Sequence, residues 1–182
     1  MASEVALPRE LHKFMWEIMN NPRVVPEIPT LIPSYEALKG LLTSTNVKFA
    51  RGIPALLDSP TPPTIEFINS LPSNFSRQNW GVYILILERP GSPTAVFVGS
   101  STSSEGGTRK RVLKHLSARP NSGKKPSAEA VQQALDRGYT IVHCAQIAKV
   151  PLPKQQKKRI RVLIISKNNH ILTLVPKILD QI

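Results

Sequence analysis

Residues 80–116 carry the pattern that most restricts how this chain can fold. An aliphatic, β-branched run at residues 82–87 predicts a buried strand, and the Pro- and Gly-containing segment 89–93 predicts a turn. A second apolar run, residues 95–98, ends at Gly99, and the polar residues 100–107 predict a glycine-rich loop. The stretch therefore predicts two strands, a loop and then the helix described next.

Residues 108–116 predict a helix with two chemically different faces. Val112, Leu113 and Leu116 have the spacing of one apolar face. The remaining surface of the helix is strongly basic and carries Arg109, Lys110, Arg111 and Lys114.

The flanking segments complete an α+β fold. Ser127 is a plausible N-cap for a helix over residues 128–137 that ends at Gly138, and residues 139–147 predict a third strand. Short amphipathic helices, separated by prolines, are predicted before residue 80 and are expected to pack on the later sheet. They lie at residues 8–20, 35–42, 47–57 (with an interruption around residues 52–54) and 64–71. The expected architecture is a small three-stranded antiparallel sheet flanked by helices, with a helical extension at residues 1–79 and the main domain at residues 80–182.

The charge of the chain is concentrated in its second part. Residues 1–79 hold seven Lys or Arg and seven Asp or Glu, whereas residues 80–182 hold 17 and five. The whole net charge of +12 therefore lies where the two strands and the basic helix are predicted. A basic half beside a neutral half favours a polyanionic partner such as nucleic acid. The alternative is a solvated basic surface that only aids solubility.

Other features of the sequence indicate an intracellular protein. No apolar run approaches the roughly 20 residues of a membrane-spanning helix, and the N-terminal segment lacks the apolar core of a secretory signal. A single cysteine, Cys144, excludes an internal disulfide and is expected to be a small buried apolar residue. The run KQQKKRIR, residues 154–161, has the composition of a nuclear-import patch, which adds the nucleus as a candidate location.

Three motifs in a fixed order resemble the GIY-YIG nuclease family, and most closely a fungal-type variant with a serine-rich loop. They are Gly81-Val82-Tyr83, Phe97-Val98-Gly99, and Arg111 followed by His115. The resemblance covers roughly the second half of the chain and implies the small sheet and flanking helices expected above.

The resemblance also implies roles for individual side chains. Tyr83 would be the base or water-orienting group, and Arg111 would bind the phosphate through its planar fork of N–H donors. His115, one helical turn beyond Arg111, would relay a proton or bind phosphate. Gly99 would allow a sharp turn into the loop. Arg109, Lys110 and Lys114, with the loop residues Lys124 and Lys125, are the expected nucleic-acid contacts.

Two departures from the family pattern affect the expected chemistry. Phe97 replaces the second tyrosine and has no hydroxyl. The family uses a glutamate to bind a divalent metal ion, but this chain has no glutamate after Glu129. The spacing of the motifs puts the position of that glutamate near Asn168. A neutral amide is a poor ligand for Mg²⁺. Glu129, from the preceding helix, is the remaining metal-ligand candidate, with Mg²⁺ as the cofactor if the protein is active.

These observations predict a GIY-YIG-type protein that binds nucleic acid, with DNA as the expected form, and in which cleavage is weak or lost. One alternative is an active, metal-dependent endonuclease that hydrolyses phosphodiester bonds with Glu129 or Asp180 as the ligand. A second is a protein-interaction module whose N-terminal helices bind a protein partner. No membrane partner is expected.

Overall fold

A computed structural model describes Trp16 and residues 32–57, 59, 61, 63–118 and 128–152. Over these residues the chain forms helices and an antiparallel sheet, which is an α+β arrangement, as predicted. The elements in chain order are α3 (Tyr35–Ser44), β1 (Lys48–Phe49), α4 (Ile53–Leu57), α5 (Ile65–Ser70), β2 (Asn79–Glu88), β3 (Ala95–Ser101), α6 (Gly107–Leu116), α7 (Glu129–Asp136) and β4 (Thr140–Pro151).

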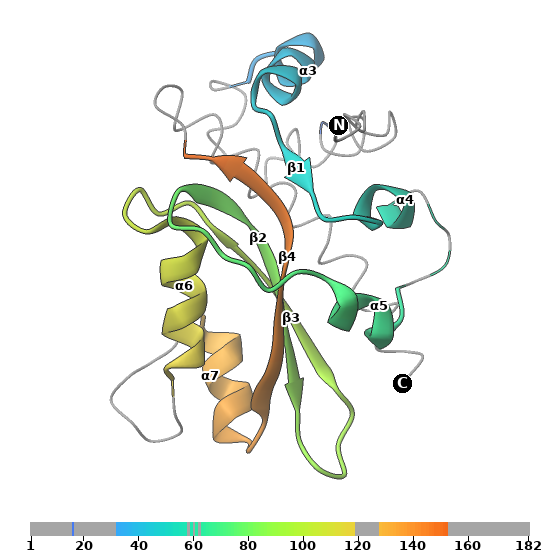
Figure 1. The fold of residues 1–182 in the computed structure, drawn as a ribbon, viewed down its shortest axis with the longest axis vertical. Helices are drawn as coiled ribbons and strands as arrows, with labels where there is room; N and C mark the ends of the chain where they lie inside the picture. The colour runs from blue at the N-terminus through green and yellow to red at the C-terminus, as the bar shows by residue number, and fades with distance from the viewer. Residues whose placement is uncertain are drawn as a thin grey trace.

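The described strands form one antiparallel sheet in the order β1-β4-β2-β3. This is one strand more than the three that the sequence predicted. β2 is central and pairs along its length with both β3 and β4, and a turn in which the Ser92 amide donates to the Arg89 carbonyl joins β2 to β3. Figure 1 shows the sheet in the middle of the molecule, between two groups of helices.

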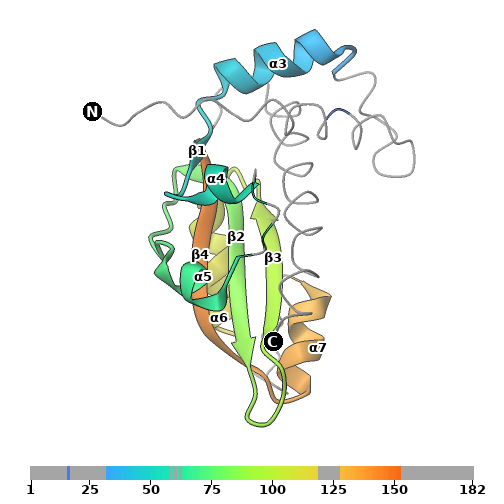
Figure 2. The same cartoon turned by 90° about the vertical axis from the view of Figure 1, so that its right-hand side faces the viewer.

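Both faces of β2 are buried, which explains its continuous apolar run. Alternate residues point to opposite faces of a strand. One set packs with α3, α4 and α5 and comprises Trp80, Val82, Ile84 and Ile86. The other set packs with α6 and α7 and comprises Tyr83, Leu85 and Leu87. Figures 1 and 2 show α4 and α5 on one side of the sheet and α6 and α7 on the other.

The helix predicted at residues 47–57, with an interruption around residues 52–54, is wrong in its first part, whereas its second part is helical. The segment contains the short strand β1, which pairs with the edge of β4, and then the short helix α4. Gly52 lies between them with a φ of 83°, a left-handed conformation that interrupts a right-handed helix. Pairing with an existing strand therefore overrides the local helical pattern.

The predicted apolar face of α6 is also wrong in part. Val112 is buried as expected, but Leu113 and Leu116 are 48% and 38% exposed, and Thr108 and His115 are buried instead. Side-chain hydrogen bonds fix the start of the helix: the Thr108 hydroxyl donates to the Asn79 carbonyl (3.1 Å), and the Ser101 hydroxyl to the Gly107 carbonyl (2.9 Å). These bonds set which side of α6 faces the sheet.

Several smaller expectations are confirmed. Ser34 caps α3, Gly138 follows α7 with a φ of 88°, and the helices before residue 80 share a core with the sheet. The helix predicted at residues 8–20 lies outside the described residues except for Trp16, which is helical and contacts the ring of Tyr35. Ser127 and the basic run 154–161 also lie outside them.

We expect two Gly→Ala substitutions to change stability in opposite directions. Gly107 has a φ of 51°, and a Cβ there would press against the carbonyl oxygen of Asn79, so Gly107→Ala should cost roughly 2–4 kcal/mol. Gly40 lies inside α3 with open space around it, so Gly40→Ala should add about 0.5–1 kcal/mol. Urea unfolding followed by circular dichroism measures both. If the two substitutions changed the free energy of unfolding by the same amount, this account of how α6 begins would be contradicted.

Candidate functional site

Tyr83 lies at the centre of β2 and points toward α6. Its side chain is fully buried, and its partners across the sheet are Gly99 on β3 and Gln146 on β4. Its hydroxyl lies 2.8 Å from Nε2 of His115 on α6. Two residues predicted to act together, 32 positions apart in the chain, are therefore in direct contact.

Gly99 makes room for the Tyr83 ring rather than turning the chain. The sequence predicted a sharp turn at this position, but Gly99 lies within β3 and is not among the described glycines with a positive φ. A Cβ at Gly99 would lie 2.5 Å from both Cζ and the hydroxyl of Tyr83, and 2.8 Å from Cε1 of Phe97. The glycine of the second motif is thus required by packing against the tyrosine of the first.

Gly81, on β2, is restricted by the neighbouring strand β4. A Cβ at Gly81 would press against the carbonyl oxygen of Ala148 and lie 2.9 Å from Nε2 of Gln146. The two motif glycines therefore let three strands and their side chains approach closely on the α6 side of the sheet.

Three aromatic rings meet at this position. The ring centroids of Tyr83 and His115 are 5.8 Å apart, those of Phe97 and His115 are 5.7 Å apart, and those of Tyr83 and Phe97 are 6.4 Å apart. All three pairs are tilted, within the range in which aromatic pairs attract. Phe97 therefore contributes packing where the family pattern has a hydroxyl.

Arg111 connects this buried pair to the surface. The residue is exposed on α6, and its side chain is close enough to Tyr83 to influence the pKa of the phenol. Burial raises the pKa of the Tyr83 hydroxyl above its ordinary value of 10, although Arg111 acts in the opposite direction. The phenol therefore keeps its proton at neutral pH.

The protonation of His115 sets the direction of the hydrogen bonds. Burial, and then the positive charges of Arg111 and Lys114, lower the pKa of His115 from 6.5 to about 4, so the ring is neutral at pH 7. A guanidinium can only donate, so the Tyr83 oxygen is the acceptor in any bond with Arg111. We infer that the phenol in turn donates to Nε2 of His115, which leaves the ring proton on Nδ1.

The other predicted basic contacts fall into two groups. Arg109, Lys110 and Lys114 are exposed on α6, and Lys110 forms an exposed ion pair with Glu105 at 3.4 Å. Such surface pairs contribute little to stability. Lys124 and Lys125 lie outside the described residues.

The described residues do not fit a metal ion. No three His, Cys, Asp or Glu side chains within them are grouped so that they could hold one. Glu129 is exposed on α7 and accepts a hydrogen bond from Gln133 at 3.4 Å. Asn168 and Asp180 lie outside the part of the chain that the structure describes.

Two buried polar residues beside Gly81 were not predicted as part of the site. Gln146 is 4% exposed and Thr108 is fully buried, and both side chains lie against the position of Gly81. The signal for Gln146 was present, because it is a single amide inside the apolar run 145–148 of a predicted strand. Thr108 gave no such signal, since a hydroxyl at a helix start is usually solvated.

Comparisons of the chain with protein-family models, curated proteins and solved structures give no match. The family resemblance therefore rests on the motif residues themselves. Among the described residues, every helix is too short or too polar to cross a lipid bilayer.

We expect stability to fall with acidification because His115 is buried in its neutral form. Between pH 6.5 and about 4 the unfolded chain binds a proton at His115 that the native state excludes. The free energy of unfolding should therefore decrease as the pH falls through this window, by up to about 1.4 kcal/mol per pH unit and roughly 3 kcal/mol in total.

Urea unfolding at a series of pH values measures this loss. The variant His115→Asn should show a flatter dependence over the same window, whatever its absolute stability. The same slope in both proteins would show that residue 115 is not buried as a neutral imidazole.

Proposed function

We propose that this protein binds nucleic acid through phosphate contacts from the exposed surface of α6, in the manner of a GIY-YIG-type protein in which cleavage is weak or lost. The observation that carries the proposal is the link from exposed Arg111 to the buried pair of Tyr83 and His115. A guanidinium has five N–H donors in a planar fork, so one that gives a bond to a phenol can also bind phosphate oxygens. The buried pair orients that fork.

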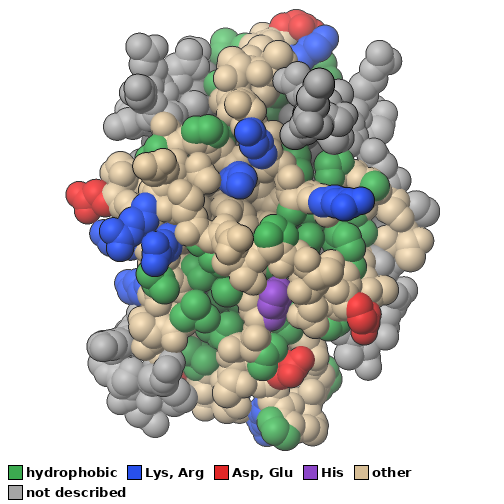
Figure 3. All heavy atoms as spheres, in the orientation of Figure 1, with side chains coloured by type: hydrophobic (Ala, Val, Ile, Leu, Met, Phe, Trp, Pro, Cys, Tyr) green, Lys and Arg blue, Asp and Glu red, His purple; other side chains and the backbone are tan. Residues whose placement is uncertain are grey.

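The charge of α6 supports the same function. The helix has ten residues, four of them Lys or Arg, and no acidic residue. Figure 3 shows Lys and Arg side chains gathered beside α6 on this face of the molecule. A run of cations on one helix attracts a phosphate backbone and releases its counterions on binding.

The burial of the pair supports weak or absent cleavage. A tyrosine that activates water must contact that water, but the side chains of Tyr83 and His115 are both 0% exposed. The raised pKa of Tyr83 also keeps its proton in place. The positions of these two side chains thus suit the anchoring of Arg111 better than the activation of water.

Binding to a 20-base-pair DNA duplex, measured by fluorescence anisotropy between 50 and 200 mM salt, tests the proposal. If the four cations of α6 each contact a phosphate, the association constant should fall roughly 100-fold over this range. Arg111→Ala should weaken binding and reduce the salt slope by about one. Arg51→Ala is the matched control, because it removes the same charge from an exposed position next to α4, on the other side of the sheet.

Two results would contradict the proposal. An affinity independent of salt would exclude phosphate binding, and equal losses in the two variants would exclude a specific role for α6. Incubating the same proteins with supercoiled plasmid and Mg²⁺ tests the statement on cleavage. Rapid nicking by the wild type that Arg111→Ala abolishes would favour the active endonuclease instead.

A further inference from the structure

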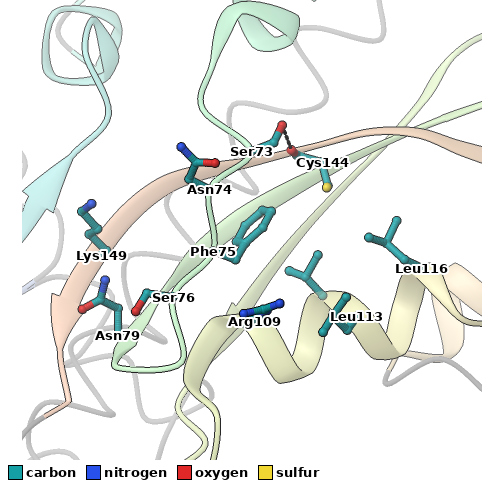
Figure 4. A pocket seen from close by; sticks show the side chains of 11 residues that line it. Ser73, Asn74, Phe75, Ser76, Asn79, Arg109, Leu113, Leu116, Cys144 and Lys149 are labelled. Atoms are coloured by element: carbon teal, nitrogen blue, oxygen red, sulfur yellow. Dashed lines mark hydrogen bonds between the residues drawn. The ribbon is translucent and has the colours of Figure 1, made fainter.

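A groove of about 490 Å³ lies on the opposite flank of α6 from Arg111. It is formed by α6, β4 and the segment 73–79 that leads into β2 (Figure 4). Arg109, Val112, Leu113 and Leu116 line it from the helix, whereas Tyr83, Arg111 and His115 do not. It is therefore a separate feature from the site described above. Its volume lies within the roughly 300–1,000 Å³ of small-ligand sites.

The inner surface of the groove is apolar and partly open. Phe75 is half-buried against the core, and Leu113 and Leu116 are among the most exposed large apolar side chains of the described residues. These are the two leucines that the helical pattern predicted to be buried. In Figure 4, Phe75 lies between the end that carries Lys149 and the end that carries Leu116. This surface fits the flat face of an aromatic ligand.

The polar lining of the groove is cationic and rich in hydrogen-bonding groups. Arg109 on α6 and Lys149 on β4 supply the charge, and no carboxylate is among its described lining residues. Amide and hydroxyl side chains surround them: Ser73, Asn74, Ser76 and Asn79. The Ser73 hydroxyl donates to the Cys144 carbonyl at 2.7 Å, which fixes one wall of the groove to β4.

We propose that this groove binds one unpaired nucleotide of a nucleic-acid strand. The base stacks against Phe75 and the two leucines, its polar edge meets the amides, and its phosphate contacts Arg109 and Lys149. This inference rests on the proposed function, because Arg109 is also part of the basic surface of α6. A backbone bound along that helix passes the mouth of the groove, where an unpaired base can enter.

The chemistry favours a nucleotide over an acidic peptide. Base stacking on an aromatic side chain is tolerant of sequence, and here the aromatic surface, the amides and the cations occur within one cavity of suitable size. The carboxylates of an acidic peptide would match the two cations, but a nucleotide joins a stacking face, a hydrogen-bonding edge and a phosphate in one unit.

The test compares two DNA duplexes of equal length, one fully paired and one with a single unpaired adenine nucleotide. The wild type should bind the second more tightly, roughly five- to 100-fold if stacking has its usual strength. Leu113→Glu places a carboxylate at the mouth of the groove and should abolish this preference. Val142→Glu is the matched control, since Val142 is 50% exposed, lies outside the groove lining, and the charge change is the same. It should keep the preference.

A second variant separates stacking from charge. Phe75→Leu keeps an apolar side chain in the core but removes the aromatic face, so it should reduce the preference while leaving binding to the paired duplex unchanged. Retained preference in both Leu113→Glu and Phe75→Leu would overturn the proposal.

The remaining outcomes identify which proposal fails. If the wild type binds both duplexes equally and with normal salt dependence, the groove proposal fails and the proposed function stands. If it binds neither, the proposed function fails and this inference fails with it. A Glu-rich peptide containing one Phe provides the last arm: binding of the peptide that Leu113→Glu abolishes, with no preference between duplexes, would assign the groove to a protein partner.

Discussion

The hydrogen bond between the hydroxyl of Tyr83 and Nε2 of His115 is the interaction on which the rest of this structure depends. It connects the central strand to α6 in a region from which water is excluded, where an unpaired partner would cost about 1–3 kcal/mol. Gly99 supplies the space for the phenol, and Phe97 closes the aromatic cluster. Together with the hydrogen bonds of Thr108 and Ser101 that set the rotation of α6, this contact holds His115 against β2 one helical turn from Arg111.

The sequence predicted most of this arrangement because the signals were local and strong. The apolar run of β2, the turn at residues 89–93 and the ordered motif residues indicated the hairpin, the helix and the Tyr83, Arg111 and His115 set. The predictions that were wrong share one physical cause, which is contact between segments that are distant in the sequence. β1 forms only because β4 offers an edge to pair with, and the rotation of α6 is set by hydrogen bonds from Thr108 and Ser101.

The exposed leucines of α6 connect the two proposals. An amphipathic pattern normally marks the face of a helix that packs on the core. The residues of α6 that pack on the sheet are Thr108, Val112 and His115. The helix therefore presents Leu113 and Leu116 to the groove and its cations to solvent. One helix thus carries the surface proposed to bind phosphate on one flank and the groove proposed to bind a nucleotide on the other. A surface of this kind suits a backbone with an unpaired base.

Nuclear magnetic resonance of the His115 imidazole in ¹⁵N-labelled protein tests the central claim most directly. Long-range ¹H–¹⁵N correlations report which ring nitrogen carries the proton, and His115→Asn assigns the signal. The account predicts a neutral ring at pH 7, protonated on Nδ1, that remains neutral until the pH approaches about 4. A ring that titrates near 6.5, or that carries its proton on Nε2 at pH 7, would contradict it.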